Sequence, residues 1–204
     1  GPIELESINY SILESKRAHR SLEIKSIDKF PRLTDYIVPP GVRIADTSRV
    51  RLGAYLSEGT TVMHEGFVNF NAGTLGAAMI EGRISAGVIV GKNSDLGGGS
   101  STMGTLSGGN KVKISVGENS LLGANAGLGI PLGNNCIVEA GLYLTGGSKV
   151  EVFDRDMVSQ GVVKADQLSN QDNLLFIRNS LSGAVEARIN IKSVELNDAL
   201  HKNQ

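Results

Sequence analysis

The sequence predicts a mainly β protein built as a parallel β-helix, a solenoid with a triangular cross-section. The first observation is that aliphatic residues recur every six positions between Ile44 and Val150. A period of six fits neither the 3.6-residue turn of an α-helix nor the two-residue alternation of an amphipathic strand. The second is that a small residue often stands four positions later, where the chain could turn a corner. The third is that glycine often follows the aliphatic residue directly.

In such a solenoid each coil has three six-residue sides and buries its apolar residues against neighbouring coils. The chain holds roughly five coils of about 18 residues, more than the three or so that a solenoid needs. The β-helix is therefore expected over residues 41–152. Its inward positions are Ile44, Val50, Leu56, Val62 and Val68; Ile84, Val90, Leu96 and Thr102; Val116, Leu122 and Leu128; and Leu132, Val138, Leu144 and Val150.

Shorter segments precede and follow the solenoid. Residues 1–40 predict a short helix and then an extended piece, and we expect them to be the remnant of an N-terminal domain. Residues 153–204 predict a C-terminal extension with a hairpin, in which two apolar runs flank a turn at residues 179–183. Gly183 suits a positive φ in that turn. Residues 194–203 predict one short helix.

Composition narrows the possible functions. The net charge of −1 over 204 residues gives no electrostatic case for binding nucleic acid. No apolar run approaches the roughly 18 residues of a membrane span. The single cysteine, Cys136, falls on a small-residue position, so we expect a buried structural thiol. One cysteine makes no disulfide framework, and a cytoplasmic location is expected.

Breaks in the six-residue rhythm are where function is expected, because loops that leave a rigid scaffold often carry it. Ile84 follows Val68 by 16 residues where 12 would keep the register, so about four residues between positions 71 and 83 are expected to be extruded. Residues 102–116 predict a protruding loop, and residues 128–132 contain a third slip.

Two glutamates are the acidic candidates for chemistry, and glycine follows each of them. Glu81 stands two positions before Arg83, so both side chains could point to one side of an extended segment. The carboxylate could then act as a base or nucleophile while the guanidinium holds an anion. A surface ion pair is the alternative. Glu65 could face its symmetry mates in a trimer, where like charges would demand a cation or a raised pKa; a solvated corner residue is the alternative.

Other residues support rival interpretations. His64 is the one histidine inside the solenoid, and it could be a general base or a packed residue. A single histidine does not make a zinc site. The glycine-rich stretches lack a following Gly-Lys-Ser/Thr, which argues against nucleoside triphosphate binding. Backbone amides at successive corners could instead line a groove for a pantetheine arm, with Lys164 or Arg178 at its phosphates.

Four long strings resemble the tetrahydrodipicolinate N-succinyltransferases, and the likeness extends from Pro31 to the C-terminus. They are MHEGFVNFNAGTLG, MIEGRISAGVIVGKNSDLGGGSSTMGTLSGG, LLGANAGLGIPLG and IVEAGLYLTGGSKV. The resemblance implies a homotrimer of left-handed parallel β-helices with active sites between neighbouring subunits. It also implies transfer of succinyl from succinyl-CoA to the amino group of acyclic tetrahydrodipicolinate, a step toward diaminopimelate and lysine. The family has an N-terminal domain that this chain largely lacks.

The resemblance also implies roles for individual residues. Glu81 of the E-G-R motif would be catalytic, and Arg83 would contact succinyl-CoA. Glu65 of M-H-E-G would be a Mg²⁺ ligand near the trimer axis, while Ser48 departs from the aspartate expected at a second metal position. The rest of the donor site would be lined by Gly98, Ser101, Ala124, Glu139, Ala140, Gly147, Lys164, Arg178, Asn179 and Ser180.

Two other functions stay open at this point. One is an acetyltransferase of another small amine that uses His64 as its base. The other is a non-catalytic solenoid scaffold for trimer assembly. A residue such as Arg83 near the site favours a donor with a free carboxylate over acetyl-CoA.

Overall fold

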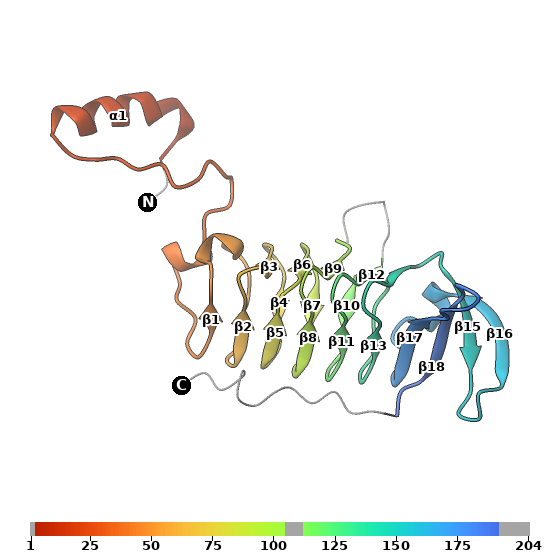
Figure 1. Ribbon diagram of the computed structural model, residues 1–204. Helices are drawn as coiled ribbons and strands as arrows, with labels where there is room; N and C mark the ends of the chain where they lie inside the picture. The colour runs from red at the N-terminus through yellow and green to blue at the C-terminus, as the bar shows by residue number, and fades with distance from the viewer. Residues whose placement is uncertain (1–2, 105–111, 192–204) are drawn as a thin grey trace.

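The structure is a computed structural model that describes residues 3–104 and 112–191. Short strands stack side by side in coils that advance steadily along one axis, from β1 to the strands of the C-terminal extension (Figure 1). Three sheets enclose one continuous apolar core. Within the solenoid the strands of successive coils pair in parallel, so the predicted mainly β fold of stacked hexapeptide repeats is confirmed.

Within the described residues, the largest sheet has ten strands, and the other two have three and five. In spatial order the first contains β1 (Arg43–Ile44), β2 (Thr60–Val62), β5 (Ala78–Ile80), β8 (Ser94–Leu96), β11 (Leu121–Leu122), β13 (Ile137–Val138), β17 (Leu174–Arg178), β18 (Val185–Ile189), β15 (Lys149–Phe153) and β16 (Ser159–Lys164). The second contains β10 (Ser115–Val116), β7 (Ile89–Val90) and β4 (Gly73–Thr74). The third contains β14 (Tyr143–Thr145), β12 (Gly127–Gly129), β9 (Ser101–Thr102), β6 (Arg83–Ile84) and β3 (Phe67–Val68).

The first break in the rhythm is not an extruded loop, so that prediction is wrong. Val68 pairs directly with Ile84 on the next coil, which makes residues 68–84 one complete turn of the solenoid. The inward rhythm continues through Thr74 and Ile80, and only the step from Ile80 to Ile84 is shortened to four residues. The register was hidden because Thr74 is polar; its hydroxyl is buried 2.7 Å from the hydroxyl of Thr60.

The third break is a second four-residue step of the same kind. Leu128 pairs with Thr102 and Leu144, and Leu132 pairs with Val116, so both ends of the step keep their places in adjacent coils. The second break, between Thr102 and Val116, includes residues 105–111, which lie outside the described residues.

A ladder of small polar side chains lines one inner corner of the solenoid. Ser94 Oγ donates to Gly117 O and accepts from the Ser120 N–H, while Ser120 Oγ accepts from the Cys136 N–H. Cys136 Sγ in turn accepts from the Leu174 N–H at 3.4 Å. Cys136 is therefore the buried structural thiol that its position predicts.

The thiol of Cys136 should resist modification in the folded protein. Its pKa is raised chiefly because burial disfavours the thiolate, and the thiolate is the reactive form. At pH 8 we expect an aromatic disulfide reagent to modify native protein about 100-fold more slowly than urea-unfolded protein. Equal rates in the two states would contradict this placement of the side chain.

The short helix predicted near the N-terminus is present, whereas the strand β16 (Ser159–Lys164) was not predicted. Helix α1 (Ile8–Arg17) follows the 3-10 turn η1 (Leu5–Ser7), buries no residue and stands apart from the coils (Figure 1). The 3-10 turn η2 (Leu33–Asp35), in which Leu33 is buried, precedes the first coil, and the 3-10 turn η3 (Thr47–Arg49) lies within it. No helix among the described residues is long and apolar enough to cross a membrane.

The predicted C-terminal hairpin is formed by β17 and β18, which pair in antiparallel fashion. Gly183 in its turn has the expected positive φ, +77°. Strands β15 and β16 form a second antiparallel pair, followed by the 3-10 turn η4 (Ala165–Leu168). The helix predicted over residues 194–203 lies outside the described residues.

Candidate active site

Glu81 stands at the first shortened side of the solenoid. It follows β5 directly, and its N–H donates to Leu96 O at 2.9 Å, which anchors the backbone to the next coil. Because Ile80 points into the core, the Glu81 side chain points outward. It is half-buried there. The short step therefore presents a partly shielded carboxylate on the surface of a rigid scaffold.

Arg83 lies on the outward face of β6 and is exposed. Its Nε donates to Ser101 Oγ on the next coil at 3.1 Å, so these two predicted donor-site residues are brought together. Among the ion pairs of the described residues, none joins Arg83 to Glu81. Glu81 and Arg83 therefore do not form the surface ion pair that was the alternative. The Glu81 carboxylate and the Arg83 guanidinium are both available to bind a ligand.

Several of the other predicted residues form one row along the solenoid axis. Gly98, Ala124, Ala140 and Arg178 each lie two positions after an inward residue of the ten-stranded sheet, on successive coils. Backbone hydrogen bonds join this row: Asn125 N–H donates to Gly98 O and Gly141 N–H donates to Ala124 O. The small side chains of Ala124 and Ala140, and the absence of one at Gly98, therefore leave the surface open along the row up to Arg178.

The row begins beside the candidate base. A Cβ atom at Gly98 would lie 3.6 Å from Glu81 Oε2, so Gly98 packs directly against the carboxylate. At the other end, Glu139 Oε2 accepts a hydrogen bond from the Arg178 N–H at 2.8 Å. Asn179 Oδ1 accepts from backbone N–H groups of the hairpin turn, where Ser180 is exposed.

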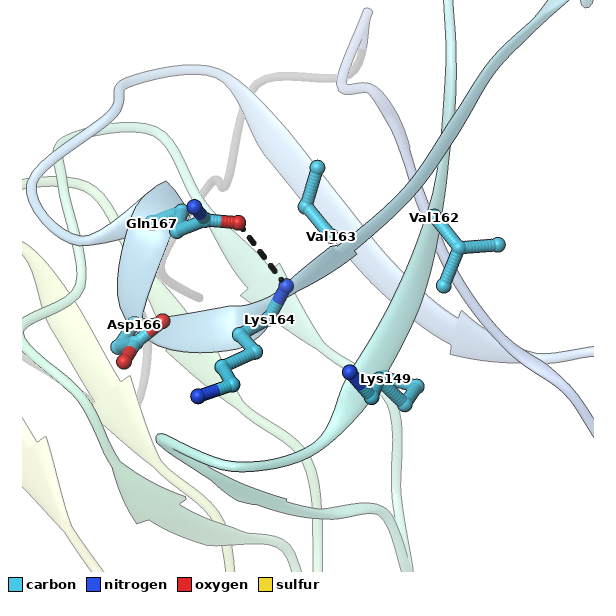
Figure 2. Close-up of a pocket in the computed structure, with 6 residues that line it drawn as sticks. All are labelled: Lys149, Val162, Val163, Lys164, Asp166 and Gln167. Carbon is cyan, nitrogen blue, oxygen red and sulfur yellow. Dashed lines mark hydrogen bonds between the residues drawn. The ribbon is translucent and has the colours of Figure 1, made fainter.

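Lys164 and Gly147 are placed near the C-terminal end of the solenoid, away from Glu81. Lys149, Lys164, Asp166 and Gln167 line a cavity of about 500 Å³. Figure 2 shows Asp166 and Gln167 on the same side as Lys164, with Lys149 across from them. Gln167 Oε1 accepts from the Lys164 N–H at 3.2 Å and fixes the start of η4. Gly147 precedes Ser148, whose carbonyl accepts from the N–H of Ala165. This cavity offers two ammonium groups, together with the Asp166 carboxylate, to a ligand.

A hollow of about 420 Å³ lies beside Arg83 and is also lined by Glu65, Phe67, Gly82, Gly99, Ser100 and Arg49. Sequence reasoning did not select Arg49. Its Nη2 donates to Glu65 O at 2.8 Å and its Nε donates to Gly66 O, so the guanidinium holds the backbone beside Glu65. Arg49 reaches this hollow because it lies on the coil that precedes Glu65 and Arg83, which the local sequence does not indicate. His64 is exposed and does not line this hollow.

Sequence reasoning also missed Asp95, which belongs to the central strand β8. Burial, and secondly the charge of Glu81, raise the pKa of Asp95 from 3.8 to about 6. The carboxylate lies within the DLGGGSS motif, but its outward position carries no periodic signal. The structure thus places a second carboxyl group near Glu81.

These features define a scaffold of stacked hexapeptide repeats. A family model described as "Hexapeptide repeat of succinyl-transferase" matches residues 113–146. The chain is 61% identical over 203 residues to a 2,3,4,5-tetrahydropyridine-2,6-dicarboxylate N-succinyltransferase of Vibrio cholerae, covering 100% of this chain and 59% of that protein. It is 63% identical over 201 residues to the Pseudomonas aeruginosa protein of the same name, covering 98% and 58%.

A solved structure gives the same relationship. A Campylobacter jejuni protein bearing the name 2,3,4,5-tetrahydropyridine-2-carboxylate N-succinyltransferase superposes with a TM-score of 0.83 at 43% identity, over 95% of this chain and 54% of that one. The predicted resemblance to tetrahydrodipicolinate N-succinyltransferases is confirmed, since the chain is homologous to them along almost its whole length. It spans about three fifths of the length of these curated relatives.

Proposed function

We propose that the chain supports transfer of a succinyl group from succinyl-CoA to the amino group of acyclic tetrahydrodipicolinate, on the route to diaminopimelate and lysine. The observation that carries this proposal is the partly shielded Glu81 carboxylate at the head of an open row of small residues. The names of relatives 61% and 63% identical support the choice of reaction.

In this proposal Glu81 acts as the general base. The acceptor nitrogen attacks the thioester carbonyl carbon, a C–N bond forms, and the N–H proton passes to the Glu81 carboxylate. The C–S bond then breaks, and the CoA thiolate takes up a proton. The exposed Arg83 guanidinium, held by Ser101, would bind the free carboxylate of the succinyl group.

The row from Glu81 to Arg178 is proposed to hold the pantetheine arm of the donor. It crosses five strands of one sheet, β5, β8, β11, β13 and β17. Four inter-strand spacings of about 4.8 Å give roughly 19 Å, comparable with an extended pantetheine arm. Glu139, Asn179 and Ser180 would flank its far end. Arg178 there, and Lys164 beside Gly147, would meet the phosphates.

A binding and turnover experiment tests the proposal. Calorimetric titration with CoA and a continuous assay of thiol release from succinyl-CoA in the presence of the acceptor are run on the same preparation. We expect saturable heat with CoA and acceptor-dependent thiol release. Absence of CoA binding would favour the non-catalytic scaffold. Turnover with acetyl-CoA but not with succinyl-CoA would favour the acetyltransferase alternative.

Replacing Arg83 should change donor selection. In Arg83→Gln we expect kcat/KM for succinyl-CoA to fall about 10- to 100-fold, because a charged hydrogen bond contributes about 1.5–3 kcal/mol. With acetyl-CoA, which lacks the free carboxylate, the same variant should change less than about threefold. The matched control is Arg20→Gln, at an exposed arginine outside the solenoid. An equal fall in kcat/KM with succinyl-CoA and acetyl-CoA would show that Arg83 does not bind the succinyl carboxylate.

The finer features of the family are also proposals for this chain. They are a left-handed coil, a homotrimer with sites between neighbouring subunits and a cytoplasmic location. The homology and the stacked hexapeptide coils support them. Sedimentation equilibrium should find three copies per particle if the trimer forms; a monomer at micromolar concentration would contradict it.

Mg²⁺ at Glu65 fits the residues only if several copies combine. The described part of one chain gathers no group of three or more His, Cys, Asp or Glu side chains that could hold a metal ion. Glu65 supplies one exposed carboxylate, and the Ser48 hydroxyl is engaged with Asp46 Oδ1 at 2.7 Å. We therefore propose that a Mg²⁺ at this position would take Glu65 from each subunit, in a structural role between subunits.

A further inference from the structure

The feature that the proposed mechanism leaves unused is the carboxyl group of Asp95. Its neighbours in β8, Ser94 and Leu96, are both fully buried in the core. Because successive side chains of a strand point to opposite faces, Asp95 points outward, to the side on which Glu81 lies. It is nevertheless half-buried, and its Oδ1 atom is buried without a hydrogen-bond partner.

The neighbouring strands supply no counter-charge to this carboxyl group. Across the sheet, Asp95 pairs with Met79 on β5 and with Leu121 on β11, both of them apolar. Glu81 lies two positions beyond Met79, and its negative charge adds to the effect of burial in disfavouring the Asp95 carboxylate. Burying a carboxylate without a hydrogen-bond donor or a cation costs free energy, and the nearby Glu81 carboxylate increases that cost.

We propose that Asp95 is a positioning residue that tunes Glu81 as a proton acceptor, an inference that rests on the function proposed above. When Asp95 is ionised, its negative charge lies in a poorly solvated place beside Glu81. A carboxylate takes up a proton more readily next to a like charge, because protonation relieves the repulsion. Asp95 would therefore favour the step in which Glu81 receives the acceptor's proton, without touching the substrate itself.

The raised pKa of the Asp95 carboxyl group also makes the stability of the folded protein depend on pH. The folded pKa of Asp95, about 6, exceeds its ordinary value of 3.8. The stabilising effect of protonated Asp95 is therefore present below pH 4 and is lost as the pH rises through about 6. Replacing Asp95 with asparagine should raise the melting temperature at pH 8 relative to wild type, and should raise it less at pH 4.5.

The first test follows the Asp95 carboxyl carbon by ¹³C NMR on aspartate-labelled protein, which requires no turnover. We expect titration near pH 6 in wild type and at lower pH in Glu81→Gln, since that variant removes the like charge. Titration near pH 4 in wild type would overturn the inference, because it would show that a donor or cation pairs with Asp95. A midpoint that does not move in Glu81→Gln would overturn it as well.

The second test compares the rate profiles of Asp95→Asn and of Asp156→Asn, a control at an exposed aspartate. We expect Asp95→Asn to lower kcat about tenfold above pH 7, where the Asp95 carboxyl group is ionised, with KM for succinyl-CoA changed less than twofold. Wild-type kcat at every pH would overturn the inference. If wild type itself shows no succinyl transfer, the proposed function fails while the NMR result still decides whether the two carboxyl groups are coupled.

Discussion

Glu81→Gln should lower kcat for succinyl transfer by about 10²- to 10⁴-fold, the range expected for loss of a general base. Glutamine keeps the size of the side chain but cannot accept the amine proton. The Glu81 N–H, which donates to Leu96 O, is a backbone group, so the coil should stay intact. CoA affinity should change less than threefold, because the row beyond Gly98 is untouched.

The control for this variant is Glu118→Gln. Glu118 is also an outward glutamate of the solenoid, but its carboxylate lies 3.5 Å from the ammonium group of Lys92 on a partly exposed surface. Its replacement should leave kcat within about twofold of wild type, as expected for a surface pair of small energetic value. Near-wild-type turnover by Glu81→Gln, measured by thiol release at saturating substrates, would exclude Glu81 as the base.

Leu122→Ala should cause a large loss of stability in the middle of the solenoid. Leu122 is fully buried between Leu96 and Val138 of the adjacent coils. Truncation of a buried leucine to alanine costs about 2–5 kcal/mol through lost apolar contact and the cavity left behind. In a solenoid each coil is supported only by its neighbours, so the coils on both sides should be affected.

Urea unfolding followed by circular dichroism measures this effect, with Leu181→Ala as the matched control. Leu181 lies in the hairpin turn and is 98% exposed, so the same chemical change there should cost less than about 0.5 kcal/mol. If the two leucine variants unfolded at the same urea concentration, the inward register of the ten-stranded sheet would be wrong at Leu122.

The overall fold could be predicted from sequence because one simple rule dominates it. Every inward position of a thin solenoid needs an aliphatic or small residue, and that demand repeats each six residues. The rule failed at Thr74, where two hydroxyl groups satisfy each other inside the core. A polar residue at an inward position ended the visible register, so a shortened side was interpreted as an extruded loop.

The candidate site was only partly predictable, for a related physical reason. Glu81 and Arg83 share one motif and one short step, so local sequence is enough to suggest them. Asp95 and Arg49 reach the same region from other coils, and outward positions carry no period that would place them there. The positions of Asp95 and Arg49 near Glu81, and the burial of Asp95, follow from the stacking of the coils and are not encoded in the six-residue pattern.

A crystal structure of the protein with succinyl-CoA bound tests the central claim most directly. We predict that the thioester carbonyl lies within about 4 Å of Glu81, with the pantetheine arm running along Gly98, Ala124 and Ala140. The phosphates should lie at the Arg178 and Lys164 end. A donor bound on another face of the solenoid, with its thioester far from Glu81, would contradict the account.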